Sequence, residues 1–438
     1  MRIGFVIDYY QPHAIGGAER STRELARALV ERGHEVTVLT PSYGAAREET
    51  DDGVRIYRYW FPRRMEPGQT APAFWIKNPL YYWASSRAIT ACARERQIEI
   101  FHAQNTFVQL ATYLASRRLG IPCVATVRDL GSLCSIGHLA SVAYDPAHRC
   151  AKSFLRCARE FAARYHGRAR LGFRTLLFFD SLLKQADLAW RQRILRRYAR
   201  IIFVSRGLKE VYLQHGFRAE AERLAVAHNL PPNIAGRREN VGGPPAEWHL
   251  PEASPVVAYA GKLSLGKGAH VLFEAIPRVV ERRPEVVFVL AGSPTPQVEV
   301  PRTVPEHNIR LLGRVATEQV YALLKRANLF VLPSVWPEPL SSAVLEALAF
   351  GVPVIGTNCG GTPEQIIDGE NGRLVERGDP AALAEAILNA LADPIRLRRM
   401  GEGCSAILRE RFDRDKIVND LLAIYAAAIA ERAGATRR

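Results

Sequence analysis

The stretch Ser334–Gly372, SVWPEPLSSAVLEALAFGVPVIGTNCGGTPEQIIDGENG, decides the fold and frames the candidate site. The apolar run before it predicts a strand that ends at Pro333, with Glu338 in the loop that follows. A helix is expected to begin near Ser341 and to carry Glu346. Eight residues at about 100° each leave the two carboxylates roughly 80° apart, so both can face one crevice.

The start of that helix is a predicted phosphate-binding position. Its first backbone N–H groups have no partner within the helix, and the helix dipole is positive there. Carboxylates on either side can accept hydrogen bonds from ribose and hexose hydroxyls. The pattern therefore favours a nucleotide-sugar site, and the alternative that the spacing leaves open is two solvated carboxylates on a helix.

A second candidate for phosphate binding is Gly261–Gly268, GKLSLGKG, directly after a predicted strand at Val256–Ala260. Lys262 and Lys267 on this turn can pair with a diphosphate. Transfer of a group from a diphosphate without a metal ion needs such positive charge, because the departing diphosphate must be neutralised. An ordinary turn with two surface lysines is the alternative. The segment also approaches the phosphate loop of nucleotide triphosphatases, but Gly268 replaces the magnesium-binding hydroxyl and no later predicted strand ends in an acidic residue.

The N-terminal part of the chain predicts a βαβ unit. A strand at Ile3–Ile7 is followed by a helix at Ala18–Arg32 and a second strand at Glu35–Thr40. Gly16 and Gly17, between the first strand and the helix, lack the full dinucleotide-binding pattern. They still allow the backbone to come close to a phosphate or a sugar.

The same alternation continues and then restarts after a Pro-, Gly- and Asn-rich stretch at 231–255, the predicted interdomain linker. It predicts an α/β protein of two Rossmann-like, doubly wound parallel-sheet domains, at residues 1–235 and 236–415. The other predicted strands are Ile98–His102, Cys123–Val127, Ile201–Ser205, Val286–Ala291, Ile309–Leu312, Leu329–Leu332 and Val352–Gly356.

Polar residues follow two predicted strands of the N-terminal part and are expected to face the same crevice. His102 ends a strand, Gln104 follows it, and the carboxyl ends of parallel strands point at the crevice. His102 could orient or help deprotonate an acceptor hydroxyl, or it could be a structural hydrogen-bonding residue. Arg128 and Asp129 follow the next strand and are expected to face the same region.

The composition indicates a globular chain with one strongly basic segment. The 438 residues are 48% hydrophobic and 24% charged, with a formal net charge of +15. Seven scattered cysteines favour a reducing compartment, and no apolar run is long enough to span a membrane, so a cytoplasmic protein is expected. Residues 151–200 hold thirteen Lys or Arg against three acidic residues, which predicts an anionic partner or a solvated helix face.

Two further patterns lie in and beside that segment. Cys134, Cys150 and Cys157, with His138 and His148 nearby, could form a metal site, but their spacing does not match the C-x-x-C pairs of structural zinc sites. Free thiols are the favoured interpretation, and no metal is predicted. Apolar residues at helical spacing predict one apolar stripe, at Leu176, Phe179, Leu183, Ala186, Trp190 and Ile194.

At these residues the chain resembles the family 4 retaining glycosyltransferases of the GT-B architecture, over nearly its whole length. The likeness is carried by two glutamates with seven residues between them, by EALAFGVPVIGT and GGTPEQIIDGENG, and by GKLSLGKG. It implies two domains facing across a cleft and a final helix at 416–438 that crosses back to the N-terminal domain. It also implies sugar transfer from a nucleotide-diphosphate sugar, with retention and with neither a metal nor a cofactor.

The resemblance also implies roles for single residues. Glu338 would contact hydroxyls of the transferred sugar, Glu346 would hold the ribose, and Lys262 and Lys267 would bind the diphosphate. The rest of the implied donor site is the backbone at Leu340, Ser341 and Ser342, the close approach of Gly16 and Gly17, and Arg314 in the turn near the base. The chain departs from the family at Leu340 and Ser341, where Phe-Gly is usual, and at Arg128 and Gln104, where many members have histidine.

The sequence therefore predicts a glycosyltransferase of surface polysaccharide, glycolipid or glycoconjugate assembly, acting on a carbohydrate or lipid-linked acceptor. The basic stretch suggests contact with an anionic membrane at its inner face, as a peripheral protein of the cell envelope. A sugar-nucleotide epimerase on the same fold is the alternative, with His102 as its one acid–base candidate. A nucleic-acid binder is a weaker alternative, because no nucleic-acid-binding module is recognised.

Overall fold

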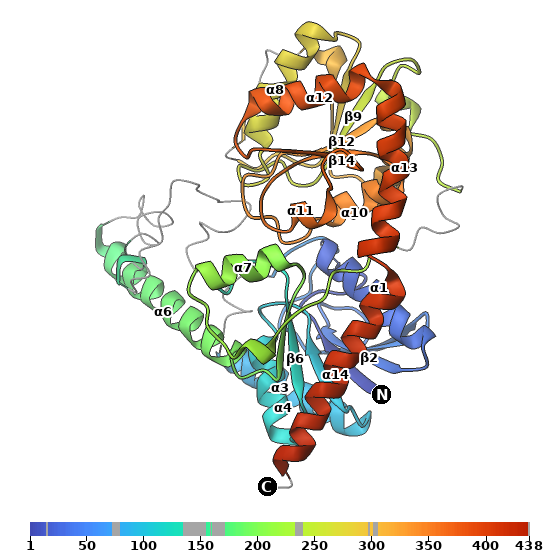
Figure 1. Cartoon of the computed structure of the whole chain (residues 1–438). Helices are drawn as coiled ribbons and strands as arrows, with labels where there is room; N and C mark the ends of the chain where they lie inside the picture. The colour runs from blue at the N-terminus through green and yellow to red at the C-terminus, as the bar shows by residue number, and fades with distance from the viewer. Residues whose placement is uncertain are drawn as a thin grey trace.

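The computed structural model describes residues 1–14, 16–71, 79–134, 155–157, 159, 171–232, 240–296, 298–300 and 305–436. Figure 1 shows two sheets with their helices, one above the other, the N-terminal one in blue to green and the C-terminal one in yellow to red. Buried hydrophobic side chains fill the space between strands and helices in both halves. The predicted fold class, two doubly wound parallel-sheet units, is confirmed.

The first sheet has eight strands in the order β3-β4-β2-β1-β5-β6-β7-β8. Neighbouring strands are parallel, except that β3 pairs with β4 in the antiparallel sense. The central strands are short, wholly apolar or nearly so, and buried, as expected for a parallel sheet covered on both faces. The strands are β1 (Arg2–Val6), β2 (Glu35–Pro41), β3 (Glu48–Asp51), β4 (Val54–Tyr59), β5 (Ile100–Ala103), β6 (Cys123–Val127), β7 (Arg200–Phe203) and β8 (Leu224–Val226).

Helices connect these strands, and each buries one face. In the first of them Leu25, Ala28 and Leu29 are buried, as the helical spacing predicts. The helices are α1 (Gly17–Glu31), α3 (Pro79–Glu95), α4 (Gln109–Leu119), α6 (Leu171–Leu195) and α7 (Arg206–Gln214), with a short 3₁₀ turn η1 (Ala221–Arg223).

The second sheet has six strands in the order β11-β10-β9-β12-β13-β14, all parallel. The strand order reverses between β9 and β12, and in the first sheet between β1 and β5. Ligands of open α/β sheets bind beyond the carboxyl ends of the strands at such reversal points. The strands are β9 (Val256–Ala260), β10 (Val287–Ala291), β11 (Ile309–Gly313), β12 (Leu329–Leu332), β13 (Val354–Thr357) and β14 (Gly372–Val375).

The helices of the second half lead into the long helix α14 (Arg414–Thr436), which returns to the first half (Figure 1). The Tyr425 hydroxyl of α14 lies 2.6 Å from Nδ1 of His102 in β5, and Glu431 pairs with Arg200 at 2.6 Å. The other helices are α8 (Ala269–Arg282), α9 (Thr317–Arg326), α10 (Ser342–Ala349), α11 (Thr362–Gln365), α12 (Pro380–Ala392) and α13 (Pro394–Arg411), with the 3₁₀ turns η2 (Ala246–Trp248) and η3 (Glu306–Asn308).

The predicted strands are present, with ends that differ by a residue or two. Four strands were not predicted, namely β3, β4, β8 and β14. The residues of β3 are polar and at the sheet edge, so they carry no apolar alternation, and β8 and β14 have only three and four residues. Short or edge strands give a weak periodic signal because tertiary pairing, not composition, forms them.

Helix α6 is where the structure corrects a prediction. The helix is present, but Leu183 and Trp190 of the predicted stripe are 68% and 43% exposed, while Ile194 is buried. The buried face of its second half instead carries Gln185, Leu188 and Arg191, among others. Leu176 and Phe179 lie outside the residues whose side chains are described. Among the described residues, none of the helices combines the length and the apolar composition that crossing a bilayer demands.

Glu364 of α11 caps a helix of the other half. Its carboxylate accepts the N–H groups of Arg206 and Gly207 at the start of α7, at 3.1 and 2.9 Å, and lies 3.0 Å from Nε2 of His228. Burial raises the pKa of Glu364, but the His228 ring and the two N–H groups outweigh it, so the pKa lies below its ordinary value of 4.5.

Glu364→Gln is therefore expected to destabilise the fold by about 1–2 kcal/mol at neutral pH, since a neutral amide caps α7 less well. Because the folded-state pKa is lowered, the carboxylate stabilises fully above its unfolded pKa and loses this contribution as the pH falls through the folded value. Urea unfolding at pH 7 and at about pH 3 measures the difference. Glu402→Gln, on an exposed position of α13, is the control, and an equal effect at both pH values would contradict the assignment.

Candidate active site

A cavity of about 620 Å³ lies between the two halves, at the carboxyl ends of both sheets. Most of the residues that the sequence singled out line it. They are Gly16, Gly17, Arg128, Lys262, Lys267, Arg314, Glu338, Leu340, Ser341, Ser342 and Glu346. Residues from the loop after β9, the loop after β12, the start of α10 and the start of α1 thus meet in one cleft.

Glu338 is the most highly coordinated carboxylate of the cleft. It is 4% exposed, and Lys267 Nζ lies 2.7 and 2.6 Å from its two oxygens. Trp336 Nε1 and Ser334 Oγ also donate to it, at 2.7 and 3.1 Å. Lys267 stands over the Trp336 ring as well, 5.4 Å from its centroid. The buried carboxylate is therefore paired with a cation and hydrogen-bonded by three side chains, which fixes its orientation.

Glu346 lies on α10, which begins where the sequence predicts a phosphate-binding helix start. Ser341 is the N-cap of α10, its hydroxyl accepting from Val344 N at 3.4 Å. The Glu346 carboxylate is almost fully buried and pairs with Arg20 of α1 at 2.7 Å, across the cleft. Burial raises the pKa of Glu346, and the Arg20 charge partly offsets this.

The lysine-bearing loop Gly261–Gly268 packs tightly on the neighbouring strand end. Gly268 is the N-cap of α8 with φ 71°, and a Cβ there would lie 1.7 Å from the carbonyl oxygen of Pro333. No side chain fits at that position. The close packing brings Lys267 next to the loop that carries Glu338.

The two glycines after β1 form the N-terminal wall of the cleft. Gly16 is the N-cap of α1, and its N–H donates to Oε2 of Glu19 at 2.8 Å. A Cβ on Gly17 would lie 2.6 Å from the hydroxyl of Ser342 at the start of α10. The two halves thus approach closely here, where the start of α1 faces the start of α10.

Of the residues predicted for the acceptor side, Arg128 lines the cleft. It donates to Gln104 Oε1 at 2.7 Å and to Ser21 Oγ at 3.2 Å, and it also bonds Asn229. Burial lowers the pKa of Arg128 to about 10, with Glu19 acting in the opposite direction. Gln104 is fully buried beneath it and serves to position the guanidinium.

His102 and Asp129 were expected to face the crevice, but neither is among the residues that line it. His102 is 1% exposed, and its two ring nitrogens lie 2.6 Å from Tyr425 Oη and 2.6 Å from Thr126 Oγ1. Burial, with Arg128 nearby, lowers the pKa of His102 well below its ordinary value. Asp129 accepts the N–H of Gly131 at 2.7 Å. The surroundings of His102 therefore favour the alternative that it is a structural hydrogen-bonding residue.

Several cleft residues were missed from the sequence, and three of them contact candidate site residues. Arg20 follows the Gly16–Gly17 turn by one helical turn, Trp336 precedes Glu338 by two residues, and Asn229 follows β8. Because Trp336 lies only two residues before Glu338, the sequence alone could have marked it as a neighbour of that carboxylate. Arg20 and Asn229 gave no such signal, because their partners are distant in sequence.

The cysteine stretch gives no metal site in the part of the chain that can be described. Cys134 is a free thiol, and no group of three or more His, Cys, Asp or Glu among the described residues could hold a metal ion. Cys150, His138 and His148 lie outside the described residues.

Comparison with known proteins agrees with this geometry. The family model described as "Glycosyltransferase Family 4" matches residues 15–230, and that of "Glycosyl transferases group 1" matches residues 245–404. Glycogen synthase of Mycobacterium tuberculosis is 25% identical over 453 residues, covering 98% of this chain and 95% of the relative.

Two solved structures share the fold across almost the full length of both chains. Sucrose-phosphate synthase from Thermosynechococcus elongatus superposes with a TM-score of 0.68 at 21% identity, covering 98% of this chain and 99% of the other. Anabaena Alr3699/HepE in complex with UDP-glucose gives a TM-score of 0.63 at 19% identity, covering 99% and 100%. With both halves of the chain matched by the family models and both sheets by the solved folds, the chain belongs to the family 4 glycosyltransferases (glycosyl transferases group 1) of GT-B architecture.

Proposed function

We propose that this glycosyltransferase takes its sugar from a nucleotide-diphosphate donor and retains the anomeric configuration, without a metal. The observation that carries the proposal is the convergence of Lys262, Lys267, Glu338 and Glu346 on one cavity together with the start of α10. Cations and helix N–H groups suit a diphosphate, and carboxylates suit the hydroxyls on either side of it. The UDP-glucose complex of the Anabaena protein of the same fold supports this donor class.

In this arrangement each group has a place along the donor. The diphosphate lies between Lys267 and the N–H group of Ser342 at the start of α10, with Lys262 at the cleft edge. The N–H of Ser341 donates to Gln365 Oε1 at 2.9 Å and is not directed at the donor. Glu346 accepts from the ribose, and Glu338 accepts from the transferred sugar. Arg314, which lines the same cavity, faces the base.

The reaction needs charge stabilisation more than a nucleophile. The bond from the anomeric carbon to the diphosphate oxygen breaks, and the acceptor oxygen bonds to that carbon from the same face. The acceptor proton passes to the departing diphosphate. Lys267 and the α10 dipole neutralise the charge that develops on the leaving group.

A donor panel tests the proposal. Nucleotide sugars should raise the melting temperature by mass action, and one of them by more than its free sugar or nucleotide monophosphate. NMR of the product made from that donor should show the donor's anomeric configuration, and EDTA should leave the rate unchanged. No shift from any nucleotide sugar, or an inverted product, would overturn the proposal or its stereochemical part.

Arg20→Ala should raise the pH at which donor binding is lost. The Arg20 charge lowers the pKa of Glu346, which burial raises, so its removal lets that pKa rise further. A protonated carboxyl is a weaker acceptor for ribose hydroxyls, so affinity falls from a higher pH downward. Donor titrations between about pH 5 and pH 8 measure this. Arg20→Lys keeps the charge and should resemble the natural chain, while an unshifted profile for Arg20→Ala would argue against the pairing.

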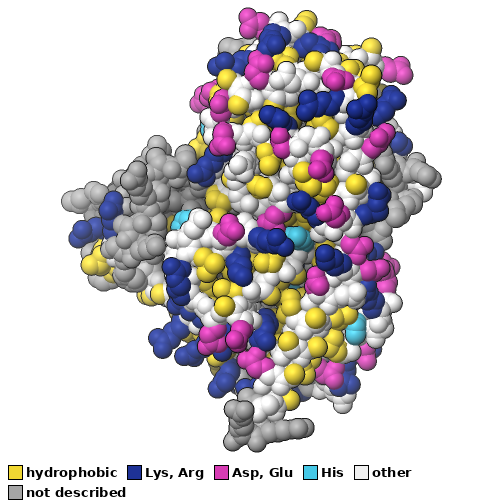
Figure 2. Space-filling model, in the orientation of Figure 1, with side chains coloured by type: hydrophobic (Ala, Val, Ile, Leu, Met, Phe, Trp, Pro, Cys, Tyr) yellow, Lys and Arg dark blue, Asp and Glu magenta, His cyan; other side chains and the backbone are white. Residues whose placement is uncertain are grey.

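We further propose that the acceptor is lipid-linked and that α3 and α6 face an anionic membrane. Large apolar side chains are exposed there, Leu80 at 76% and Trp83 at 52% on α3, and Leu183 at 68% and Trp190 at 43% on α6. Figure 2 shows Lys and Arg side chains, with Asp and Glu side chains among them, at the lower left of the visible face, where Figure 1 places the end of α6. Exposed apolar groups flanked by cations suit a headgroup interface, at about 1 kcal/mol per basic residue.

Vesicle flotation tests the membrane part by itself. The protein should float with vesicles that contain anionic lipid at low salt, and less with neutral ones. Leu183→Ser with Trp190→Ser should weaken flotation, whereas Ile395→Ser, an exposed apolar residue of α13, should not. Failure to float at low salt would remove the membrane contact and leave the transferase proposal standing.

A further inference from the structure

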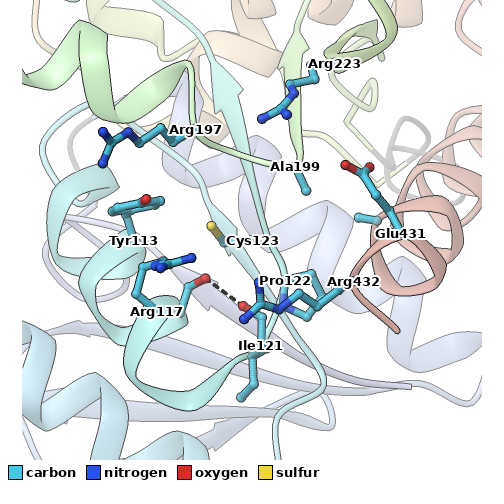
Figure 3. Close-up of a pocket in the computed structure, with 12 residues that line it drawn as sticks. Tyr113, Arg117, Ile121, Pro122, Cys123, Arg197, Ala199, Arg223, Glu431 and Arg432 are labelled. Carbon is cyan, nitrogen blue, oxygen red and sulfur yellow. Dashed lines mark hydrogen bonds between the residues drawn. The ribbon is translucent and has the colours of Figure 1, made fainter. Parts of the chain in front are cut away.

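A second pocket lies near the amino-terminal ends of β6 and β7 in the first sheet, whereas the cleft lies at the carboxyl ends of the strands. It has a volume of about 160 Å³ and is lined by α4, the start of β6, the turn before β7, η1 and α14 (Figure 3). Cys123, at its floor, is the first residue of β6, whereas Arg128 of the cleft follows the last residue of that strand. The two sites are therefore separated by the length of a strand, and nothing in the transfer reaction uses the second one.

The lining of this pocket is strongly basic. Arg117, Arg197, Arg223 and Arg432 line it against a single acid, Glu431. Glu431 is already paired with Arg200 at 2.6 Å, so it does not neutralise the pocket.

The four arginines differ in their partners. Arg223 pairs with Glu220 at 2.6 Å, and Arg432 donates to the carbonyl of Gly120 at 3.2 Å. Within the described part of the chain, neither Arg117 nor Arg197 has a carboxylate partner. The four arginines line one pocket, and their positive charge favours an anion there.

We propose that this pocket binds the phosphate monoester group of a phosphorylated small molecule or lipid headgroup. The two negative charges of such a group match the two arginines that lack a carboxylate. Guanidinium groups present paired N–H donors that fit phosphate oxygens, which a lysine cluster would not do as specifically. Figure 3 shows Arg117 and Arg223 reaching in from opposite sides of Cys123.

The remainder of the pocket suits the organic part of the ligand. Tyr113, Ile121, Pro122 and Ala428 provide an apolar wall beside the arginines. The Ser116 hydroxyl is taken up by the carbonyl of Ile121 at 2.6 Å, so it is not directed at a ligand. Because the walls come from α4 and α14, a bound phosphate joins the C-terminal helix to the first sheet.

Phosphate titration of the full chain tests the proposal. Lys267→Ala serves as the background, so that anion binding in the cleft is weakened, and ionic strength is held constant because exposed charges are screened by salt. Inorganic phosphate should give saturable heat in calorimetry. Arg117→Ala with Arg197→Ala should weaken this binding about tenfold or more, since each charged hydrogen bond contributes substantially. These two arginines are chosen because their removal leaves no carboxylate unpaired.

Arg398→Ala, on an exposed position of α13, is the matched control and should bind phosphate as the background does. A hexose phosphate that binds more tightly than inorganic phosphate identifies a soluble ligand. Flotation with phosphatidic acid vesicles that depends on Arg117 and Arg197 identifies a headgroup. The proposal is overturned if phosphate gives no saturable heat, or if the double arginine variant binds it as well as the control does.

Discussion

Lys267→Ala should lower the transfer rate by about 10²–10³-fold and abolish the stabilisation by donor, while the protein stays folded. Its ammonium group is 2.7 and 2.6 Å from the Glu338 oxygens and lines the cavity proposed for the diphosphate. Loss of this charge removes stabilisation of the leaving group. It also leaves Glu338 buried with only Trp336 and Ser334 as donors, so the carboxylate that would hold the sugar is no longer fixed by a cation.

Initial rates over a range of donor concentrations and thermal shifts measure the two effects separately. Lys416→Ala, which removes an exposed lysine of α14, should change neither. Lys267→Arg keeps the charge and should recover part of the rate, because a guanidinium also pairs with phosphate but is larger and planar. A full donor shift in Lys267→Ala would mean that the diphosphate lies elsewhere in the cleft.

Much of the fold and half of the site were predictable because their signals are local in sequence. The central strands are almost wholly apolar runs, as expected for strands buried on both sheet faces. Glu338, Ser341 and Glu346 lie within nine residues, so one strand-loop-helix segment fixes them relative to one another. Lys262 and Lys267 likewise lie in one loop, between strand β9 and helix α8.

The remaining contacts depend on which distant elements meet. Arg20 pairs with Glu346 only because α1 of one half faces α10 of the other. His102 lies one residue before the end of β5, and Tyr425 from the last helix covers it and takes up one of its ring nitrogens. Neither partner could be inferred from spacing. The exposed Leu183 and Trp190 likewise show that a helical period gives the angular position of a stripe and not the direction in which it faces.

Gly268→Ala should destabilise the C-terminal half by about 3–5 kcal/mol, or prevent its folding. The glycine has φ 71°, a left-handed conformation that costs alanine about 1 kcal/mol. The larger part of the effect is steric, because the added Cβ would lie 1.7 Å from the Pro333 carbonyl oxygen, which is backbone and cannot turn aside. The same contact explains why a hydroxyl residue is absent here, although the turn otherwise approaches a triphosphatase loop.

Gly313→Ala separates the cost of the left-handed backbone conformation from the steric clash of the added Cβ. Gly313 has nearly the same conformation, φ 65°, but no atom lies within 4 Å of a Cβ built on it. It should therefore show only the conformational cost, about 1 kcal/mol in urea unfolding, with donor binding retained. The difference between the two variants measures the packing of the lysine loop against the strand end that precedes Glu338. Equal losses would mean that this packing is loose, and the fixed distance between Lys267 and Glu338 would then have no structural basis.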